Sequence, residues 1–187
     1  MTKKPSGVRA VLTLLLITAV MALLLAAVNA VTKDPIAAAK EEKTRAALSG
    51  VLAPGVELGE ELSDFPDSTG LVKTVYKTTD GYVVEVLPSG YGGEIDMVVG
   101  ISGDLTVTGV QLISHSETSG LGAYAAAAGE KGQNFRGQFE GTSGVLAVKK
   151  DGGTIDALTG ATVTSRAVTG GVNAALACAS ALEGGAK

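Results

Sequence analysis

The sequence lacks tryptophan and contains a single cysteine, Cys178, and a single histidine, His115. Structural zinc sites, iron–sulfur clusters and haem bound through a CxxCH motif each need several of these side chains at fixed spacings, so such metal centres are excluded. A lone cysteine forms no disulfide within the chain, and its neighbours Ala177 and Ala179 predict that it fills the core. Any redox function must therefore use an organic cofactor.

Basic residues are scarce beyond the N-terminus. The formal net charge is −4, and because Lys3, Lys4 and Arg9 all precede Ala10, the rest of the chain carries −7. An acidic domain repels the phosphates of nucleic acid and the headgroups of anionic lipids. Nucleic acid is therefore not an expected partner, whereas proteins or a buried ligand are.

A run without charged residues occupies residues 10–32, and as a helix it reaches about 34 Å, enough to cross a bilayer. Basic residues precede it, so the positive-inside rule places residues 1–9 in the cytoplasm and the later domain on the extracytoplasmic side of the cell (inner) membrane. The alternative is a signal peptide cleaved after Ala30. The run is longer than the roughly 7–15 residues usual for such a peptide, so we favour a single-pass anchor.

The remainder predicts one α+β domain with an antiparallel sheet and packed helices. Residues 33–70 are expected to form a connector, with a helix from about Pro35 to Gly50 and then a loop or short helix over residues 52–70. Strand patterns at residues 71–78, 81–87, 95–101 and 105–114 predict an antiparallel meander at the start of a domain of residues 71–187. A helical stretch at 120–128, a further short segment at 135–139, a strand at 145–148 and a closing helix at 163–182 follow.

Two adjacent glycines, Gly170 and Gly171, lie inside the closing helix. Each costs about 1 kcal/mol relative to alanine in a helix interior. We therefore expect another element to pack closely against them.

Hydroxyl-bearing residues gather just before the closing helix, where residues 156–165 read Asp-Ala-Leu-Thr-Gly-Ala-Thr-Val-Thr-Ser. At face value one of these hydroxyls caps the helix. The same helix start offers free amides and a positive dipole, and Gly160 and Ala161 leave room for an approaching anion. The segment therefore predicts a phosphate site.

The pattern Asp156-x-x-Thr159-Gly160-Ala161-Thr162 resembles the flavinylation signature of FMN-binding domains. This family includes the G subunits of Rnf complexes and the C subunits of the sodium-pumping NADH:quinone oxidoreductase. The resemblance implies that Thr162 carries FMN through a phosphoester, attached by a separate flavin transferase that uses FAD and magnesium. A threonine hydroxyl is a poor nucleophile without an activating base, so transfer by another enzyme is physically reasonable.

Two further segments resemble the same family in their order and spacing. Residues 90–95, Gly-Tyr-Gly-Gly-Glu-Ile, resemble its GYGG-x-I segment, and residues 115–122, His-Ser-Glu-Thr-Ser-Gly-Leu-Gly, resemble H-x-E-T-P-G-L-G with Ser119 in place of proline. Seen singly, these glycines are ordinary turn residues and His115 is a structural histidine. Together they imply a flavin pocket, in which Tyr91 or Tyr124 can stack on the flavin ring or contact its edge. The residues expected to bind the cofactor around Thr162 are Tyr91, Gly92, Gly93, His115, Glu117, Thr118, Gly120, Leu121, Gly122, Asp156, Thr159, Gly160, Ala161, Val163, Thr164 and Ser165.

A dinucleotide-binding fold is a competing interpretation, because residues 120–125 fit G-x-G-x-x-A and Glu140 follows twenty residues after Gly120. Too few residues follow for the alternating strands and helices of a doubly wound sheet. Soluble nicotinamide is also not expected outside the membrane. We therefore reject this interpretation.

The resemblance implies an electron-carrier subunit that is not catalytic alone. It would relay electrons through FMN in a membrane complex that moves electrons between reduced ferredoxin and NAD, coupled to sodium or proton transport, with the other membrane subunits as partners. Two alternatives stay open. One is another membrane-anchored extracytoplasmic FMN protein, such as a quinone-reductase C subunit; the other is a cofactor-free anchored binding module in which Thr162 only caps a helix.

Overall fold

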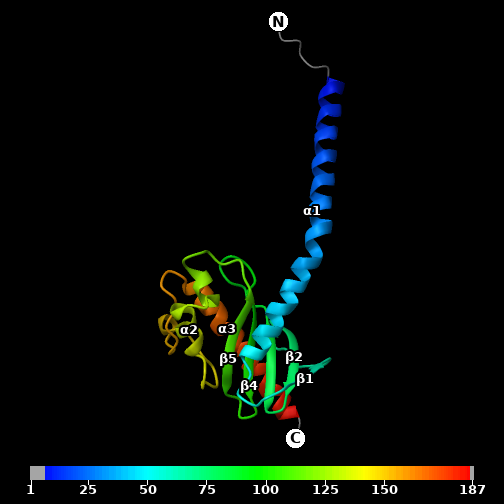
Figure 1. Cartoon of the computed structure of the whole chain (residues 1–187). Coiled ribbons are helices and arrows are strands. Elements are labelled where there is room, and N and C mark those ends of the chain that lie inside the picture. The colour runs from blue at the N-terminus through cyan, green and yellow to red at the C-terminus, as the bar shows by residue number, and fades with distance from the viewer. Residues whose placement is uncertain (1–6, 186–187) are drawn as a thin grey trace. The chain divides into compact units, whose positions relative to one another are not determined.

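The computed structural model describes residues 7–185, so Lys3 and Lys4 of the predicted cytoplasmic N-terminus lie outside the described residues. The chain divides into two compact units, Met1–Glu42 and Lys43–Lys187. The described residues of the first unit form the larger part of one long helix, and the second unit contains a sheet with its covering helices (Figure 1). The domain boundaries expected from the sequence stay a prediction.

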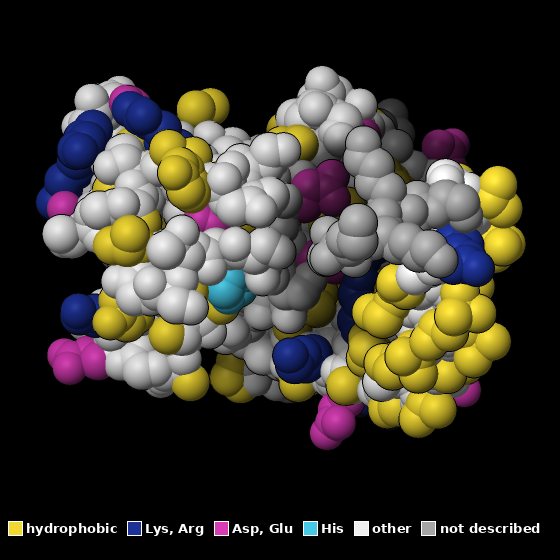
Figure 2. Space-filling view, turned by 90° about the horizontal axis from the view of Figure 1, so that it is seen from above, with side chains coloured by type: hydrophobic (Ala, Val, Ile, Leu, Met, Phe, Trp, Pro, Cys, Tyr) yellow, Lys and Arg dark blue, Asp and Glu magenta, His cyan; other side chains and the backbone are white. Residues whose placement is uncertain are grey.

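Helix α1 (Gly7–Gly50) is long and apolar enough to cross a membrane. Its large hydrophobic side chains between Val8 and Val31 are exposed. Figure 2, seen from above, shows many hydrophobic side chains at its right. The sequence predicts a second helix starting near Pro35, but α1 continues through that proline. Proline removes one backbone hydrogen bond, to the carbonyl four residues earlier, and the alanine-rich stretch after it favours helix strongly enough to continue.

The second unit is built on a five-stranded antiparallel meander in the order β1-β2-β3-β4-β5. Its strands are β1 (Leu58–Leu62), β2 (Val72–Thr78), β3 (Gly81–Val86), β4 (Asp96–Ser102) and β5 (Val107–Ser114). The last four agree closely with the predicted strands. Because consecutive strands pair antiparallel throughout, the sheet is not the parallel sheet of a dinucleotide-binding fold.

The core lies between the sheet and α3 (Thr162–Gly185), which runs behind the strands in Figure 1. The side chains of β3 and β4 alternate between the two faces, as the period of a strand requires. Val84 and Val86 pair with Val99 and Met97 and face α3. Val83 and Val98 face the other way, where they pack with Ala47, Leu48, Val51 and Ile113. Both faces of the central strands are therefore buried.

Cys178 lies on the core side of α3, as predicted. Burial raises the pKa of its thiol to about 11. The thiol is therefore protonated and unreactive near neutral pH.

Strand β1 corrects the prediction of a loop or short helix over residues 52–70. It is an edge strand with a bulge between Leu58 and Glu61, and it carries few of the β-branched side chains that signal strands. At Gly59 an added Cβ would lie 2.7 Å from the Lys77 carbonyl oxygen, so β1 pairs where the backbones approach closely. Neighbouring acidic residues conceal this strand in the sequence.

The sequence predicts a strand at residues 145–148, but the structure has none there. Val148 makes an isolated parallel bridge with Ile155, and Val145 is 94% exposed. The backbone of Leu146 is held instead by a side chain of α3: Asn173 Oδ1 accepts from the Leu146 N–H at 2.8 Å, and Asn173 Nδ2 donates to its carbonyl at 2.8 Å. One side-chain amide thus takes the place of a strand neighbour.

Short helices occupy the segment between β5 and α3. The predicted stretch at 120–128 contains the 3-10 helix η1 (Gly122–Ala126). The helix α2 (Glu130–Gly137) begins five residues before the segment expected at 135–139, and the 3-10 turn η2 (Lys149–Asp151) was not predicted. The predicted closing helix is α3, extended by a residue at its start and by three at its end.

Gly170 and Gly171, in the interior of α3, differ in their surroundings, and this difference yields a prediction. A Cβ on Gly171 would lie 3.0 Å from Pro88 Cγ and 3.1 Å from Met97 Sδ, whereas a Cβ on Gly170 would meet nothing within 4 Å. We expect Gly170→Ala to raise the free energy of unfolding by about 0.5–1 kcal/mol through helix propensity. We expect Gly171→Val to lower it by about 1–3 kcal/mol through overpacking.

Urea titration of the detergent-solubilised full chain, followed by circular dichroism, measures both changes. Equal effects at the two positions would show that α3 does not approach the sheet most closely at Gly171.

Candidate functional site

The turn that precedes α3 is fixed by the side chain of Ser165. Its hydroxyl oxygen accepts a hydrogen bond from the Leu158 N–H and donates one to the Ala161 carbonyl, each at 2.9 Å. Gly160, with φ 73°, supplies the left-handed residue of this turn. The Ala161 N–H donates to the Leu158 carbonyl at 2.9 Å. Thr162, the first residue of α3, is thereby held in one position.

Thr162 and Thr164 both lie in the first turn of α3 but have different surroundings. Thr164 is 1% exposed, and its hydroxyl donates to Oε2 of Glu117 at 2.5 Å. Thr162 is half-buried, and its hydroxyl oxygen accepts a hydrogen bond from the Lys150 ammonium at 3.3 Å. Because first-turn amides have no acceptor within a helix, the positive end of the helix dipole lies beside Thr162. Of these two hydroxyls, only that of Thr162 can meet an external molecule.

Glu117 joins three segments around Thr162. The residue is 7% exposed; its Oε1 accepts from the Gly92 N–H at 2.9 Å, while its Oε2 accepts from the Thr164 hydroxyl. The loop of residues 90–95, the loop of residues 115–122 and the start of α3 therefore meet at one side chain. A buried carboxylate needs such donors to offset its lost hydration.

Two glycines of the family-like segments are explained by this meeting point. A Cβ on Gly122 would lie 2.5 Å from both Glu117 Oε2 and Thr164 Oγ1, and a Cβ on Gly92 would overlap the Ser116 carbonyl. Any side chain at either position would separate the loops from each other or from α3.

A cavity of about 550 Å³ opens beside Thr162, and we call it the Thr162 cavity. Its lining combines hydroxyls, glycine, apolar side chains and one lysine. The lining residues are Tyr91, Glu117, Thr118, Leu121, Gly122, Lys150, Gly160, Ala161, Thr162, Val163 and Thr164. Ten of these eleven residues are in the set expected to bind the cofactor.

The remaining expected residues lie elsewhere. Ser165 is buried beneath the turn, and Gly92 and Gly93 are exposed in the loop beside Tyr91. Gly120, Asp156 and Thr159 line a neighbouring cavity. His115 lines a third one, beside Lys43 and Gln111, and its Nδ1 accepts from the Glu117 N–H at 3.2 Å. His115 therefore shapes the loop that carries Glu117, and its predicted contact with flavin stays untested.

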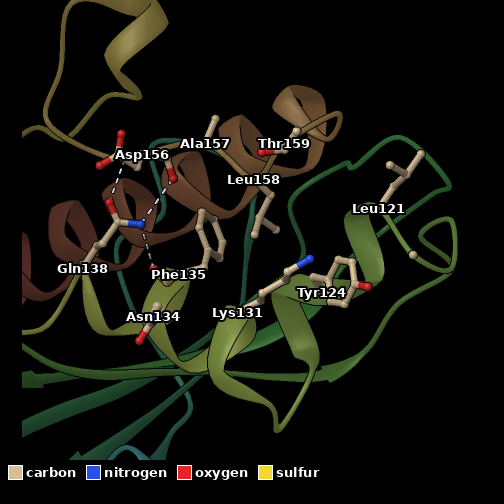
Figure 3. Close-up of a pocket in the computed structure, with 11 residues that line it drawn as sticks. Leu121, Tyr124, Lys131, Asn134, Phe135, Gln138, Asp156, Ala157, Leu158 and Thr159 are labelled. Atoms are coloured by element: carbon tan, nitrogen blue, oxygen red, sulfur yellow. Dashed lines mark hydrogen bonds between the residues drawn. The ribbon is translucent and has the colours of Figure 1, made fainter.

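The neighbouring cavity has a volume of about 670 Å³ and is shown in Figure 3; we call it the Tyr124 cavity. The Lys131 ammonium lies 4.7 Å from the centre of the Tyr124 ring, and buried Phe135 lies deeper. Leu121 lines both this cavity and the Thr162 cavity. A Cβ on Gly160 would lie 3.0 Å from Leu121 Cδ2, so the leucine packs against the turn and separates the two cavities.

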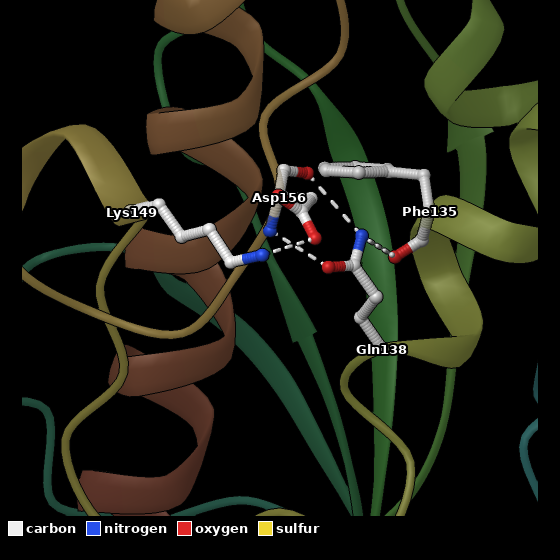
Figure 4. A network of polar contacts seen from close by, with 4 residues as sticks. All are labelled: Phe135, Gln138, Lys149 and Asp156. Carbon is white, nitrogen blue, oxygen red and sulfur yellow. Dashed lines mark hydrogen bonds and ion pairs between the residues drawn. The ribbon is translucent and has the colours of Figure 1, made fainter.

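The backbone of Asp156 is held by Gln138, as Figure 4 shows. Gln138 Oε1 accepts from the Asp156 N–H at 2.7 Å and its Nε2 donates to the Asp156 carbonyl at 3.2 Å. The carboxylate is exposed and pairs with the Lys149 ammonium at 2.7 Å. Asp156 thus presents its charge to solvent beside the turn, outside the Thr162 cavity.

Lys150 is the member of the Thr162 cavity that the sequence did not predict. It lies twelve residues before Thr162 and reaches that threonine because η2 and residues 152–161 turn the chain back. The one signal in the sequence is the pair Lys149-Lys150 before a glycine turn in an otherwise acidic domain.

Two family models match the chain. The model of the FMN-binding domain family matches residues 90–177, a range that includes the three segments joined by Glu117. The model of the RnfG N-terminal region matches residues 1–51, a range that includes all of α1.

Two of three relatives resemble the chain over most of its length. It is 34% identical to the G subunit of an ion-translocating oxidoreductase complex of Methanosarcina acetivorans, over 94% of this chain and 96% of the relative. It is 35% identical to the G subunit of a proton-translocating ferredoxin:NAD(+) oxidoreductase complex of Clostridium ljungdahlii, over 87% and 86%. A sodium-translocating counterpart from Acetobacterium woodii is 43% identical over 50% and 46%.

Glu117→Ala tests the meeting point of the three segments. The change leaves the Gly92 N–H and the Thr164 hydroxyl without their acceptor, so we expect the free energy of unfolding to fall by about 1–3 kcal/mol. Glu94→Ala removes an exposed carboxylate from the same loop as Gly92, and we expect it to change stability by less than about 0.5 kcal/mol. Urea unfolding with hydrogen exchange at the Gly92 amide compares the two variants. Unchanged exchange at Gly92 in Glu117→Ala would contradict the bridging role.

Proposed function

The chain belongs to the family of G subunits of ion-translocating oxidoreductase complexes, and we propose that it carries FMN esterified to Thr162 and relays electrons within an Rnf-type membrane complex. The observation that carries this proposal is the position of Thr162, which is the first residue of α3 and lines a cavity. It lies in the part of the chain that matches the FMN-binding domain.

The Thr162 cavity fits FMN in size and in chemistry. Its volume of about 550 Å³ lies within the range of roughly 300–1,000 Å³ usual for ligand pockets. Tyr91, Leu121 and Val163 offer apolar surface for a flat ring. The helix start and Lys150 offer the positive charge that a phosphate requires.

Thr162 is the available hydroxyl among the four in the motif. Thr164 donates to Glu117, and Ser165 is fully engaged with Leu158 and Ala161. Thr159 is exposed but lines the Tyr124 cavity instead. Among the hydroxyls of residues 156–165, Thr162 is therefore the one that can accept FMN in the Thr162 cavity.

Attachment requires a separate enzyme, because the side chain that contacts the Thr162 hydroxyl in the described part of the chain cannot accept a proton. That side chain is the Lys150 ammonium, which is only a donor. In the transfer from FAD, the Thr162 oxygen bonds to the phosphorus that bears riboflavin, the pyrophosphate bond breaks and AMP leaves with the bridging oxygen. The hydroxyl proton passes to a base of a magnesium-dependent flavin transferase.

When bound, FMN supplies reversible electron transfer at its ring. Thr162 holds it covalently, so the carrier cannot diffuse away. The described residues around it bind and orient the cofactor, which fits an electron-carrier subunit that is not catalytic alone. Relatives named for ferredoxin:NAD(+) oxidoreductase complexes support ferredoxin and NAD as the terminal couples, with the other membrane subunits of the complex as partners.

The apolar part of α1 serves as the membrane anchor. Its length and composition allow it to cross a bilayer, and the basic residues Lys3, Lys4 and Arg9 favour a cytoplasmic N-terminus. The flavin domain is then extracytoplasmic.

Intact mass measures the ester directly. In cells that contain an active flavin transferase, we expect the full-length chain to exceed its polypeptide mass by one FMN less one water. Thr162→Val keeps the side-chain shape but removes the nucleophilic oxygen, so this added mass is lost and the denatured band no longer fluoresces. Thr154→Val removes a nearby exposed hydroxyl and retains the label.

An unlabelled parent chain, with the same transferase labelling a second substrate, would disprove the proposal. A Thr162→Val chain that still carries the label would show that the ester is on another hydroxyl.

Membrane sidedness is measured with a single introduced thiol. Val145 is exposed, so Val145→Cys combined with Cys178→Ala should react with an impermeant maleimide added outside intact spheroplasts. The parent chain is the control, because its buried Cys178 thiol stays protonated. Labelling that requires inverted vesicles would place the domain in the cytoplasm.

A further inference from the structure

Three cations and two carboxylates gather at the turn before α3, and four of these charges form pairs. The Arg166 guanidinium donates to both carboxylate oxygens of Asp151, at 2.6 and 2.5 Å. The Lys149 ammonium lies 2.7 Å from an oxygen of Asp156. Among the described residues of this turn, only Lys150 has an uncharged partner, the Thr162 hydroxyl.

Asp151 is the nearest carboxylate along the chain that could neutralise Lys150, but Arg166 already binds it. The hydrogen bond from Arg166 holds the pKa of the Asp151 carboxyl below its ordinary value, and the charge of Lys150 adds to this effect. A bidentate arginine–carboxylate pair has favourable fixed geometry, so Asp151 gains little by leaving it. The side chain that accepts the Lys150 hydrogen bond is therefore Thr162, and both carboxylates are paired with other cations.

We propose that Lys150 binds the phosphate of the Thr162 ester and positions the cofactor in the cavity. This inference rests on the proposed function. Esterification places phosphorus directly on the oxygen to which Lys150 now donates, so the ammonium faces the new anionic group. The ester carries one negative charge, and Lys150 supplies the matching positive charge.

The surrounding negative charge favours such a partner. The chain from Ala10 onward carries −7, and the buried carboxylate of Glu117 lines the same cavity. Both raise the energy of an added anion. Lys150 lies within hydrogen-bonding distance of the Thr162 oxygen, so its positive charge offsets this repulsion locally. Lys149 already pairs with Asp156.

Lys150→Met tests the inference in the full-length chain with purified flavin transferase, FAD and magnesium. We expect the initial rate of flavin incorporation to fall roughly two- to fivefold at low salt, the size expected for loss of one exposed charge pair. The difference should shrink at high salt, because ions screen exposed charges. Lys150→Arg should restore the rate, and Lys77→Met, which removes an exposed charge on β2, should match the parent.

Phosphorus NMR of the completed ester gives a readout independent of rate. We expect the phosphodiester resonance of the parent to shift as salt is raised. The resonance of Lys150→Met should lie, at every salt concentration, near the position that the parent reaches at high salt. Thermal unfolding of both chains in the Thr162→Val background should coincide, which would exclude a general loss of fold.

The outcomes separate the two proposals. If the parent chain takes up no flavin while the transferase labels a second substrate, the proposed function fails and this inference fails with it. If the parent is labelled at Thr162 but Lys150→Met matches it in rate, salt dependence and phosphorus resonance, only the role of Lys150 is overturned. An equal loss in Lys77→Met would assign the effect to net charge.

Discussion

The buried carboxylate of Glu117 is the interaction on which the site depends. Its two oxygens bind a backbone amide of one loop and a hydroxyl of α3, so segments 25 and 47 residues away in the chain meet at one side chain. A desolvated carboxylate without donors is costly, which makes this arrangement strongly preferred over any in which the loops separate. It also occupies the hydroxyl of Thr164. The meeting of the loops beside Thr162 therefore depends on this one group, while Ser165 fixes the turn that holds Thr162.

Much of the fold could be predicted from local pattern, because strands and helices bury faces with a regular period. The alternation in β2 to β5 and the helical spacing in α3 agree with the structure. Strand β1 escaped prediction because it is held by a close backbone approach at Gly59, which leaves no hydrophobic pattern. The strand predicted at residues 145–148 failed because Asn173, far along the chain, satisfies that backbone.

The candidate site could be predicted as a set of segments but not as a geometry. The family-like motifs identify ten of the eleven residues that line the Thr162 cavity. They do not separate Asp156, Thr159 and His115, which line other cavities, from the residues beside Thr162. Lys150 lies outside every motif, and its contact depends on a turn whose path is set by tertiary hydrogen bonds. Motifs thus indicate which segments form the candidate site, while long-range contacts decide which side chains meet there.

The amides of Gln138 and Asn173 have a consequence for the surface around the site. Each holds an irregular backbone segment through its N–H and carbonyl, which every amino acid except proline possesses. The side chains of the held segment contribute little to this attachment, and Val145 among them points into solvent. Subunits built on this plan can therefore diversify the exterior between α2 and α3 to suit different neighbours, while the anchored threonine keeps its place.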